Sequence, residues 1–391
     1  MTIRTKHRNL IEDMIRREEE LVTPFGCRSS DSRGREVEES PHWLRTEFQR
    51  DRDRIIHCNA FRKLEYKTQV YVTHTGDMFR TRLTHTLEVA QIARTMAMAL
   101  RINPDLTEAI ALGHDLGHTP FGHAGETVMN ELLAGSGGFE HNDQSLRVVE
   151  LLEQRFHDRP GLNLTFEVRA GIACHSTAYD KPSINAYNED GSAPYLEAQL
   201  VDLSDQIAFN SHDIDDALSM GILKEDQLSD VPWVWELWES ARGKIPEHCR
   251  DSFGRYRALG MLIDCMVDDV LETALSNLDA CGELNSPDDI RNLKKPVVNF
   301  SEGMSRKQQE LRDFLMEAVY SHPITLRMTR KAARFLKDLF ELYKQNPELL
   351  PFDMQNRIEE WGLDRALTDY ISSMTDRHCI KEYISHFRPT T

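Results

Sequence analysis

The chain has 391 residues, of which 40% are hydrophobic, and this length and composition allow a substantial buried core. Its 47 basic and 64 acidic residues give a net charge of −17, which argues against a general nucleic-acid-binding surface. Seven scattered cysteines without a Cys-x-x-Cys pair predict reduced thiols, and the lack of an apolar stretch of about 18 residues or of a signal peptide predicts a cytoplasmic protein without a membrane span.

The first part of the chain predicts helices behind a polar arm. Residues 1–40 are charged and interrupted by proline and glycine, so we expect an N-terminal arm rather than core. Within residues 45–54, arginines alternate with aspartates, which predicts a self-neutralising face. Helical patterning runs from residue 41 to residue 155, with a glycine-rich loop at 135–138.

The second part of the chain is also predicted to be helical. A polar insert at 177–194 precedes a further helix, and inserts of this length are usually functional or mobile. Another helical region starts at residue 232 and is broken once, at 284–301. Because glycine is scarce and Leu, Ala, Glu, Arg and Met are frequent, the predicted fold class is all-α.

The segment from His114 to Glu126 is the most informative part of the chain. It contains a His-Asp doublet, two further histidines and a glutamate within thirteen residues. Imidazole nitrogen and carboxylate oxygen suit Mn²⁺, Fe²⁺, Co²⁺, Ni²⁺ or Zn²⁺. Adjacent His114 and Asp115 can reach one ion only from a helix end or a bend, and the glycines and proline of this segment supply a bend.

Two further candidate ligands complete an ordered pattern. His85 begins an amphipathic helix upstream, and Asp205 lies inside an apolar helix downstream. The order His, His-Asp, Asp is the signature of the HD phosphohydrolases, and the chain resembles that superfamily. The resemblance implies an HD-domain helical core at residues 41–230 and a C-terminal helical extension at 231–391, which completes the pocket and makes oligomer contacts.

Flanking segments narrow the resemblance to the deoxyguanosinetriphosphate triphosphohydrolase (dGTPase) family. The similar segments are residues 51–57, 61–64, 67–70, 82–85, 138–147 and 171–176, with a weaker match at 318–323. The resemblance implies an enzyme that hydrolyses a dNTP to a deoxynucleoside and inorganic triphosphate. On the same analogy we expect a homo-oligomer and a dNTP as allosteric activator.

His85, His114, Asp115 and Asp205 are the predicted metal ligands. Water and phosphate oxygens would fill the remaining positions of the ion. The ion would polarise the α-phosphoryl group and lower the pKa of a bound water. We expect Mg²⁺ or Mn²⁺, with Fe, Co, Ni or Zn as alternatives. The competing interpretation is four unrelated core or helix-capping residues.

His123 and Glu126 form the predicted catalytic pair. They are three residues apart and are therefore neighbours if a helix restarts after Gly122. By resemblance, His123 transfers a proton at the scissile P–O bond and Glu126 orients it. The alternative is a glutamate at a helix N-terminus beside a solvated histidine.

Three other histidines have open assignments. His118 is interpreted either as a pocket residue or as a donor behind a metal ligand, and His175 either as a phosphate contact or as packing. Helix capping at Asn142 or Asp143 does not explain His141 or Arg147. We therefore expect one edge of that segment to face the pocket.

The predicted sugar pocket rests on the resemblance. It implies that Gln69 and Asp213 bind the 3′-OH, that Val70 closes on C2′ and that Arg82 reaches the triphosphate. Asp213 follows Asp205 by eight residues, about two helical turns, and so lies on nearly the same face.

Two aromatic residues complete the predicted substrate contacts. Phe209 stands where the family commonly has Tyr, so one phosphate or sugar contact is lost. Tyr320 would stack on the sugar. The alternative for Val70, Phe209 and Tyr320 is ordinary core.

Two rival functions use the same residues. One is an HD-domain phosphomonoesterase or phosphodiesterase that acts on nucleoside monophosphates or cyclic dinucleotides, and the other is a nucleotide-sensing regulator. Residues 67–70 favour the dNTP hydrolase over the first, and the retained ligands and the His123/Glu126 pair favour it over the second. The base preference does not follow from the sequence.

Overall fold

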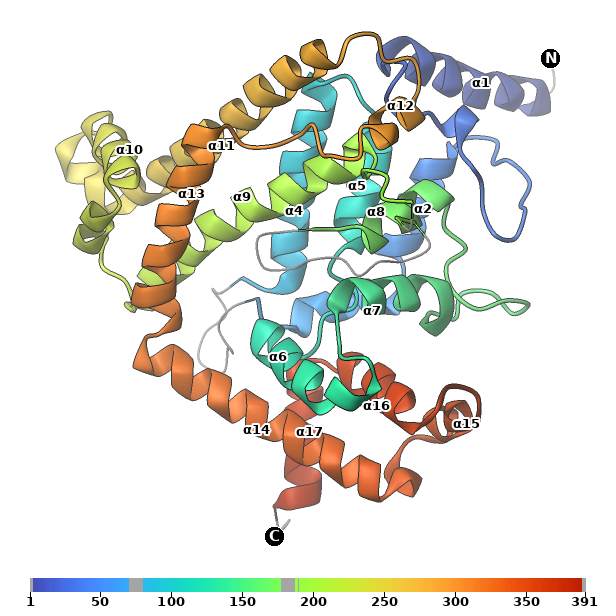
Figure 1. The fold of residues 1–391 in the computed structure, drawn as a ribbon, viewed down its shortest axis with the longest axis vertical. Helices are drawn as coiled ribbons and strands as arrows, with labels where there is room; N and C mark the ends of the chain where they lie inside the picture. Colours follow the sequence, from blue (N-terminus) through green and yellow to red (C-terminus); the bar gives the residue numbers. More distant parts are fainter. Residues whose placement is uncertain (1–2, 70–79, 177–186, 189, 389–391) are drawn as a thin grey trace.

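The computed structural model describes residues 3–69, 80–176, 187–188 and 190–388. These residues form helices without any β-strand, which confirms the predicted all-α class. The α-helices are α1 (Ile3–Leu21), α2 (Glu47–Ile56), α3 (Asn59–Lys63), α4 (Arg82–Ala99), α5 (Pro104–Gly113), α6 (Gly122–Leu132), α7 (His141–Arg147), α8 (Phe166–Ala173), α9 (Leu196–Ser219), α10 (Pro232–Gly243), α11 (Arg250–Cys281), α12 (Pro287–Asn292), α13 (Glu302–Leu315), α14 (Pro323–Gln345), α15 (Phe352–Trp361), α16 (Leu363–Ser372) and α17 (Asp376–Phe387). Helices α1 and α17 lie at opposite ends of the molecule (Figure 1). In the described part of the chain, no helix has both the length and the apolar character needed to cross a membrane.

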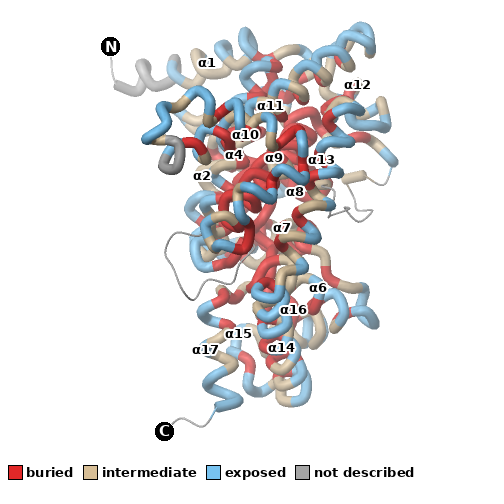
Figure 2. The backbone as a smooth tube through the Cα atoms, turned by 90° about the vertical axis from the view of Figure 1, so that its left-hand side faces the viewer, coloured by how far each residue is buried: buried red, intermediate tan, exposed pale blue. Residues whose placement is uncertain are grey.

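Helices α4, α5 and α9 form the centre of the fold. Helix α4 packs against both α5 and α9, and α9 is buried along most of its length (Figure 2). Thr81 caps α4 by accepting a hydrogen bond from the Thr84 N–H, while Asn103 caps α5 and Pro104 occupies its first turn. These caps fix where α4 and α5 begin, and therefore where their side chains meet α9.

The described residues form two hydrophobic clusters. The larger one surrounds α4, α5 and α9 and extends into α10, α11 and α13. The smaller one joins α6 to the C-terminal helices, where Met129 lies in the same cluster as Leu336 and Ile371. Helix α6 contacts α14, which runs across the lower end of the molecule (Figure 1). The helix that carries the predicted catalytic pair is thus anchored to the C-terminal region.

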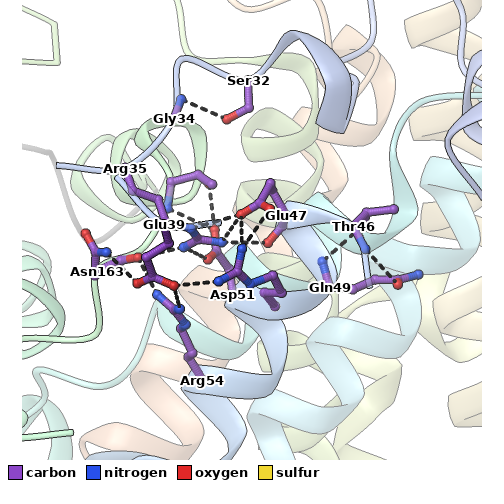
Figure 3. Close-up of polar contacts among 12 residues, drawn as sticks. Ser32, Gly34, Arg35, Glu39, Thr46, Glu47, Gln49, Asp51, Arg54 and Asn163 are labelled. Carbon is purple, nitrogen blue, oxygen red and sulfur yellow. Dashed lines mark hydrogen bonds and ion pairs between the residues drawn. The ribbon is translucent and has the colours of Figure 1, made fainter. Parts of the chain in front are cut away.

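Ion pairs attach the N-terminal segment to the core. The Arg35 guanidinium contacts Glu47 and the fully buried carboxylate of Asp51, and Glu39 pairs with Arg54 (Figure 3). Asp51 also accepts hydrogen bonds from the backbone and hydroxyl of Thr165, at 2.9 and 2.6 Å. The arginines of residues 45–54 are paired with acidic groups, but not by the alternation that the sequence suggested. Asp53 pairs with Arg45 and Arg52, whereas Asp51 pairs with Arg35, outside this segment. The predicted domain boundaries stay a prediction.

Glu197 ties the same segment to α9. Its fully buried Oε1 accepts hydrogen bonds from the Cys27 N–H at 2.9 Å and the Asn103 N–H at 3.2 Å. Burial raises the pKa of Glu197 to about 7. Ionisation of this side chain therefore costs stability in the folded state.

We expect Glu197→Gln to remove a pH-dependent loss of stability. Below the unfolded-state pKa of about 4.3 both states hold the proton, whereas between that value and about 7 only the folded state keeps it, so wild-type stability falls as pH rises. The glutamine keeps an acceptor oxygen but does not ionise. From pH 5.5 to pH 8, the unfolding free energy of the variant should rise relative to wild type by about 2 kcal/mol.

Denaturant titrations at the two pH values measure this difference, and any pH-independent effect of the amide cancels from it. Glu38→Gln, at an exposed position, is the control and should show no such trend. A Glu197→Gln difference that is the same at both pH values would contradict the assignment.

Candidate metal centre and active site

Three central helices bring the predicted metal ligands together. His85 lies in the first turns of α4, His114 caps the C-terminal end of α5, and Asp205 lies within α9. His85 Nε2 is 2.8 Å from Asp205 Oδ1, and His114 Nε2 is 3.9 Å from the same oxygen. Asp115 adjoins this group, because its Oδ2 is 3.9 Å from His85 Nε2.

The chemistry of this cluster fits a divalent cation. His114 Nε2 and Asp115 Oδ2 are buried and have no hydrogen-bond partner among the described residues. Buried polar atoms nearly always have a partner. Ligand atoms of His85, His114 and Asp205 also lie within 4.8 Å of one another. Imidazole nitrogens and carboxylate oxygens converging at such distances are suitable ligands for a first-row transition metal or Mg²⁺.

The protonation states of the cluster also suit a cation. Burial raises the pKa of Asp115, but Arg82, whose Nη1 lies 2.9 Å from Asp115 Oδ1, contributes to a net pKa well below the ordinary value. Burial likewise raises the pKa of Asp205, while a hydrogen bond from His175 helps to bring it well below its usual range. Burial lowers the pKa of His114. Anionic carboxylates and a neutral imidazole are the forms in which these groups bind metals.

His175 lies behind Asp205. Its Nδ1 is 2.7 Å from Asp202 Oδ1, its Nε2 is 3.5 Å from Asp205 Oδ2, and its side chain is buried. Asp202 is a site residue that the sequence did not indicate, although its position three residues before Asp205 places the two carboxylates on neighbouring positions of α9. The His175–Asp202 pair therefore orients a predicted ligand.

His118 contacts Asp115, another predicted ligand. Its Nε2 lies 3.0 Å from Asp115 Oδ1, and its ring stacks on the His141 ring with 3.9 Å between centroids. Of the two interpretations of His118, this geometry favours a donor behind a metal ligand. The same ring also faces Glu126, because His118 Nδ1 is 3.7 Å from Glu126 Oε2.

The predicted catalytic pair lies at the start of α6. This helix begins at Gly122, as the sequence predicted, after Phe121 in a left-handed conformation with φ +66°. The His123 ring lies edge-on to the Phe209 ring, with 5.8 Å between centroids. The His123 side chain therefore lies beside α9, the helix that also carries Asp205. The catalytic role of His123 stays a prediction.

Glu126 has a partner that the sequence did not identify. It accepts a hydrogen bond from the His141 backbone N–H at 3.0 Å, and its Oε1 also lies 3.0 Å from His141 Nδ1. Burial raises the pKa of Glu126, but His141 and the other nearby histidines bring it below its ordinary value. The sequence signals for His141 were the polar character of residues 139–147 and the family resemblance of residues 138–147. The expectation that one edge of that segment faces the pocket agrees with this contact.

Arg82 and Gln69 each have buried polar atoms without a hydrogen-bond partner among the described residues. Arg82 uses Nη1 on Asp115, while its buried Nη2 and Nε have no hydrogen-bond partner among the described residues, and neither has Gln69 Oε1. Gly122 lies against both residues, because a Cβ at this position, with φ +60°, would lie 2.8 Å from the Gln69 backbone carbonyl oxygen and 3.5 Å from Arg82 Nη2. Val70 lies outside the described residues.

Asp213 and Tyr320 meet each other. The Tyr320 hydroxyl donates a hydrogen bond to Asp213 Oδ2, and Asp213 Oδ1 is buried with no partner among the described residues. Burial raises the pKa of Asp213 to about 8. Asp205 and Asp213 both lie on α9, as their spacing predicted. Tyr320 thus has a polar contact in addition to the stacking or packing roles considered from the sequence.

The C-terminal region contacts the segments that carry Gln69 and the start of α6. Asp376, the first residue of α17, accepts hydrogen bonds from the Thr68 N–H at 3.0 Å and the Phe121 N–H at 2.9 Å. Lys67 Nζ donates to the carbonyl oxygens of His118 and Ser372. The C-terminal helices therefore hold two edges of the candidate site in place.

Comparisons with known proteins agree with this architecture. Residues 82–210 match the HD domain model, and residues 298–385 match the phosphohydrolase-associated domain. The first range contains all four predicted ligands, so fold and site define an HD-domain phosphohydrolase.

Curated relatives identify the family more closely. The chain is 47% identical to a deoxyguanosinetriphosphate triphosphohydrolase-like protein of Geobacter metallireducens over 93% of its own length and 94% of the relative's. Similar proteins of Ralstonia nicotianae and Bordetella pertussis are 45% and 46% identical, each over 93% of this chain and over 93% and 95% of their own lengths. The chain belongs to the family of deoxyguanosinetriphosphate triphosphohydrolase-like proteins.

Proposed function

We propose that this protein is a metal-dependent dNTP triphosphohydrolase that releases a deoxynucleoside and inorganic triphosphate. The observation that carries the proposal is the convergence of His85, His114 and Asp205, with Asp115 Oδ2 3.9 Å from His85 Nε2. Arg82 binds Asp115 through Nη1, and its remaining guanidinium nitrogens have no hydrogen-bond partner among the described residues. A guanidinium beside a cation site suits a phosphate group. The names of the relatives support dGTP or another dNTP as substrate.

The residues divide the reaction between them. His85, His114, Asp115 and Asp205 would hold a divalent cation, which when bound supplies a polarised phosphoryl oxygen and an activated water. Arg82 binds the phosphate chain through Nη2 and Nε, which Asp115 leaves available.

The bond that breaks joins the α-phosphorus to the 5′ oxygen of the sugar. The water oxygen attacks phosphorus, and the 5′ oxygen leaves with the nucleoside and needs a proton. His123 is the proposed donor of that proton. Glu126, which His141 holds in place, provides a fixed negative charge beside the histidines.

Product analysis tests this function against both rivals. Chromatography of a reaction containing one dNTP should detect deoxynucleoside and tripolyphosphate in equal amounts. Orthophosphate as the product would indicate a phosphomonoesterase, and nucleotide that stays unchanged with every single dNTP and every pair of dNTPs would indicate a regulator. Four dNTPs, tested singly and in pairs with Mg²⁺ or Mn²⁺, would identify the base preference, the metal and any activation. A homo-oligomer, a dNTP activator and a cytoplasmic location stay predictions.

We expect the enzyme to prefer dGTP over GTP by about tenfold or more in kcat/KM. Gln69 and Asp213 are proposed to bind the 3′-OH, and Val70 is proposed to contact C2′. A ribonucleotide must then either displace Val70 or bury its 2′-OH without a hydrogen-bond partner, at a cost of about 1–3 kcal/mol. Both nucleotides are measured with one metal and at one activator concentration.

A pair of glutamine variants locates the sugar contact. Gln69→Ala should lower kcat/KM for dGTP by about three- to tenfold, the value of one hydrogen bond. Gln91→Ala, at an exposed position of α4, is the matched control and should behave as wild type. Equal use of GTP and dGTP by wild type would refute the sugar pocket and the preference for dNTPs over nucleotides in general.

A further inference from the structure

A chain of three side chains leads from the metal cluster to the protein surface. His212, seven residues after Asp205 on α9, is buried, and its Nδ1 lies 3.2 Å from His85 Nδ1. Its Nε2 contacts the Glu88 carboxylate, and the Glu88 side chain is 41% exposed. Glu88 follows His85 by three residues on α4. Two side chains from one turn of α4 therefore contact the two ring nitrogens of His212: His85 contacts Nδ1 and Glu88 contacts Nε2.

If His85 Nε2 binds a cation, the contacts permit one arrangement of protons. His85 Nε2 faces Asp205 and the cluster, so it must offer a lone pair if it is to bind a cation. The His85 proton then lies on Nδ1 and is donated to His212 Nδ1, which must accept. His212 therefore carries its own proton on Nε2 and donates it to Glu88. The other neutral tautomer of His212 would place two protons between the rings.

His114, another predicted ligand, has a backbone partner at its second ring nitrogen. His114 Nδ1 lies 2.7 Å from the Ala111 carbonyl oxygen, a backbone acceptor that a side-chain substitution does not remove. His85 instead depends on an imidazole, which accepts or donates at Nδ1 according to its tautomer. Glu88 selects the tautomer of His212 that accepts at Nδ1, because its carboxylate accepts the hydrogen bond from His212 Nε2. The Glu88 carboxylate also pairs with Arg80, whose Nε lies 3.4 Å away.

We propose that His212 and Glu88 are positioning residues that hold His85 in the tautomer able to bind the metal, and that they thereby set metal affinity. This inference rests on the proposed metal site. Partners behind a metal-bound histidine fix its tautomer and ring orientation, and their loss typically costs about 10–100-fold in metal affinity. Neither residue is a ligand, so their effect passes through His85 alone.

Metal affinity of the full-length protein tests the proposal. The protein is stripped with a chelator, and the Kd for Mn²⁺ is measured by competition with a fluorescent chelator, alongside the melting temperature of the metal-free protein. His212→Ala should weaken binding about 10–100-fold. Glu88→Ala should also weaken binding, and Glu88→Gln should weaken it less, because the amide oxygen still accepts from His212. His248→Ala removes an exposed histidine and should bind as wild type.

The outcomes separate this inference from the metal site itself. Wild type that binds no Mn²⁺ overturns the proposed site and the inference together. Wild type that binds while His212→Ala retains its Kd within about twofold overturns only the inference, since the expected loss is larger. If His212→Ala is unfolded at the assay temperature, Glu88→Ala decides, and an unchanged Kd in that variant overturns the proposal.

Discussion

His114→Ala and Asp115→Ala are expected to abolish both metal binding and turnover. Each removes one ligand and leaves the others in the incomplete cluster around Asp205, so the cation and its activated water are lost together. Polarisation of a phosphoryl oxygen by a metal is worth several kcal/mol, which is roughly 10³-fold or more in rate. Metal content by elemental analysis and dNTP hydrolysis measure the two losses.

His157→Ala is the matched control for these variants. Its side chain is 96% exposed, so metal content and activity should equal those of wild type. Full activity in His114→Ala, in Asp115→Ala or in thoroughly chelated wild type would contradict the metal mechanism. Circular dichroism of each variant distinguishes loss of the ligand from loss of the fold.

His123→Ala is expected to lower kcat by about 10²–10⁴-fold while leaving metal content unchanged. The loss has this size because a positioned proton donor at the leaving oxygen is removed, whereas the metal cluster keeps its members. Glu126→Gln should lower kcat less, because it changes only the charge and orientation beside the histidines. If His123→Ala lost metal in proportion to activity, His123 would be a ligand and the proposed division of roles would be wrong.

Double variants show which histidine Glu126 supports. Glu126 lies 3.0 Å from His141 Nδ1, so the effects of Glu126→Gln and His141→Ala should be strongly non-additive. If Glu126 instead orients His123, the non-additivity appears between Glu126→Gln and His123→Ala. Fully additive effects in both pairs would contradict a role for Glu126 in holding either ring.

Local sequence patterns predicted the helices and the order of the ligands. The sequence indicated a helix around His85, although its buried side includes Arg82, His85 and Thr86 while Leu87 is exposed, so the expected apolar side was only partly right. The eight-residue spacing of Asp205 and Asp213 placed both on α9. Gly122 indicated where α6 begins. These features follow from the chain alone because helical periodicity and backbone preferences act over a few residues. The ordered motif then identified an HD-type cluster.

Tertiary structure decided which groups meet across the chain. His212 lies against His85, 127 residues away, and Asp376 reaches Thr68 and Phe121 across 308 and 255 residues. The sequence indicated neither contact, nor the attachment of α6 to the C-terminal helices rather than to the larger core. Spacing along a helix shows which residues share its face but not which face of another helix they will meet. That choice depends on how the two hydrophobic clusters pack, and packing is set by side chains far apart in the sequence.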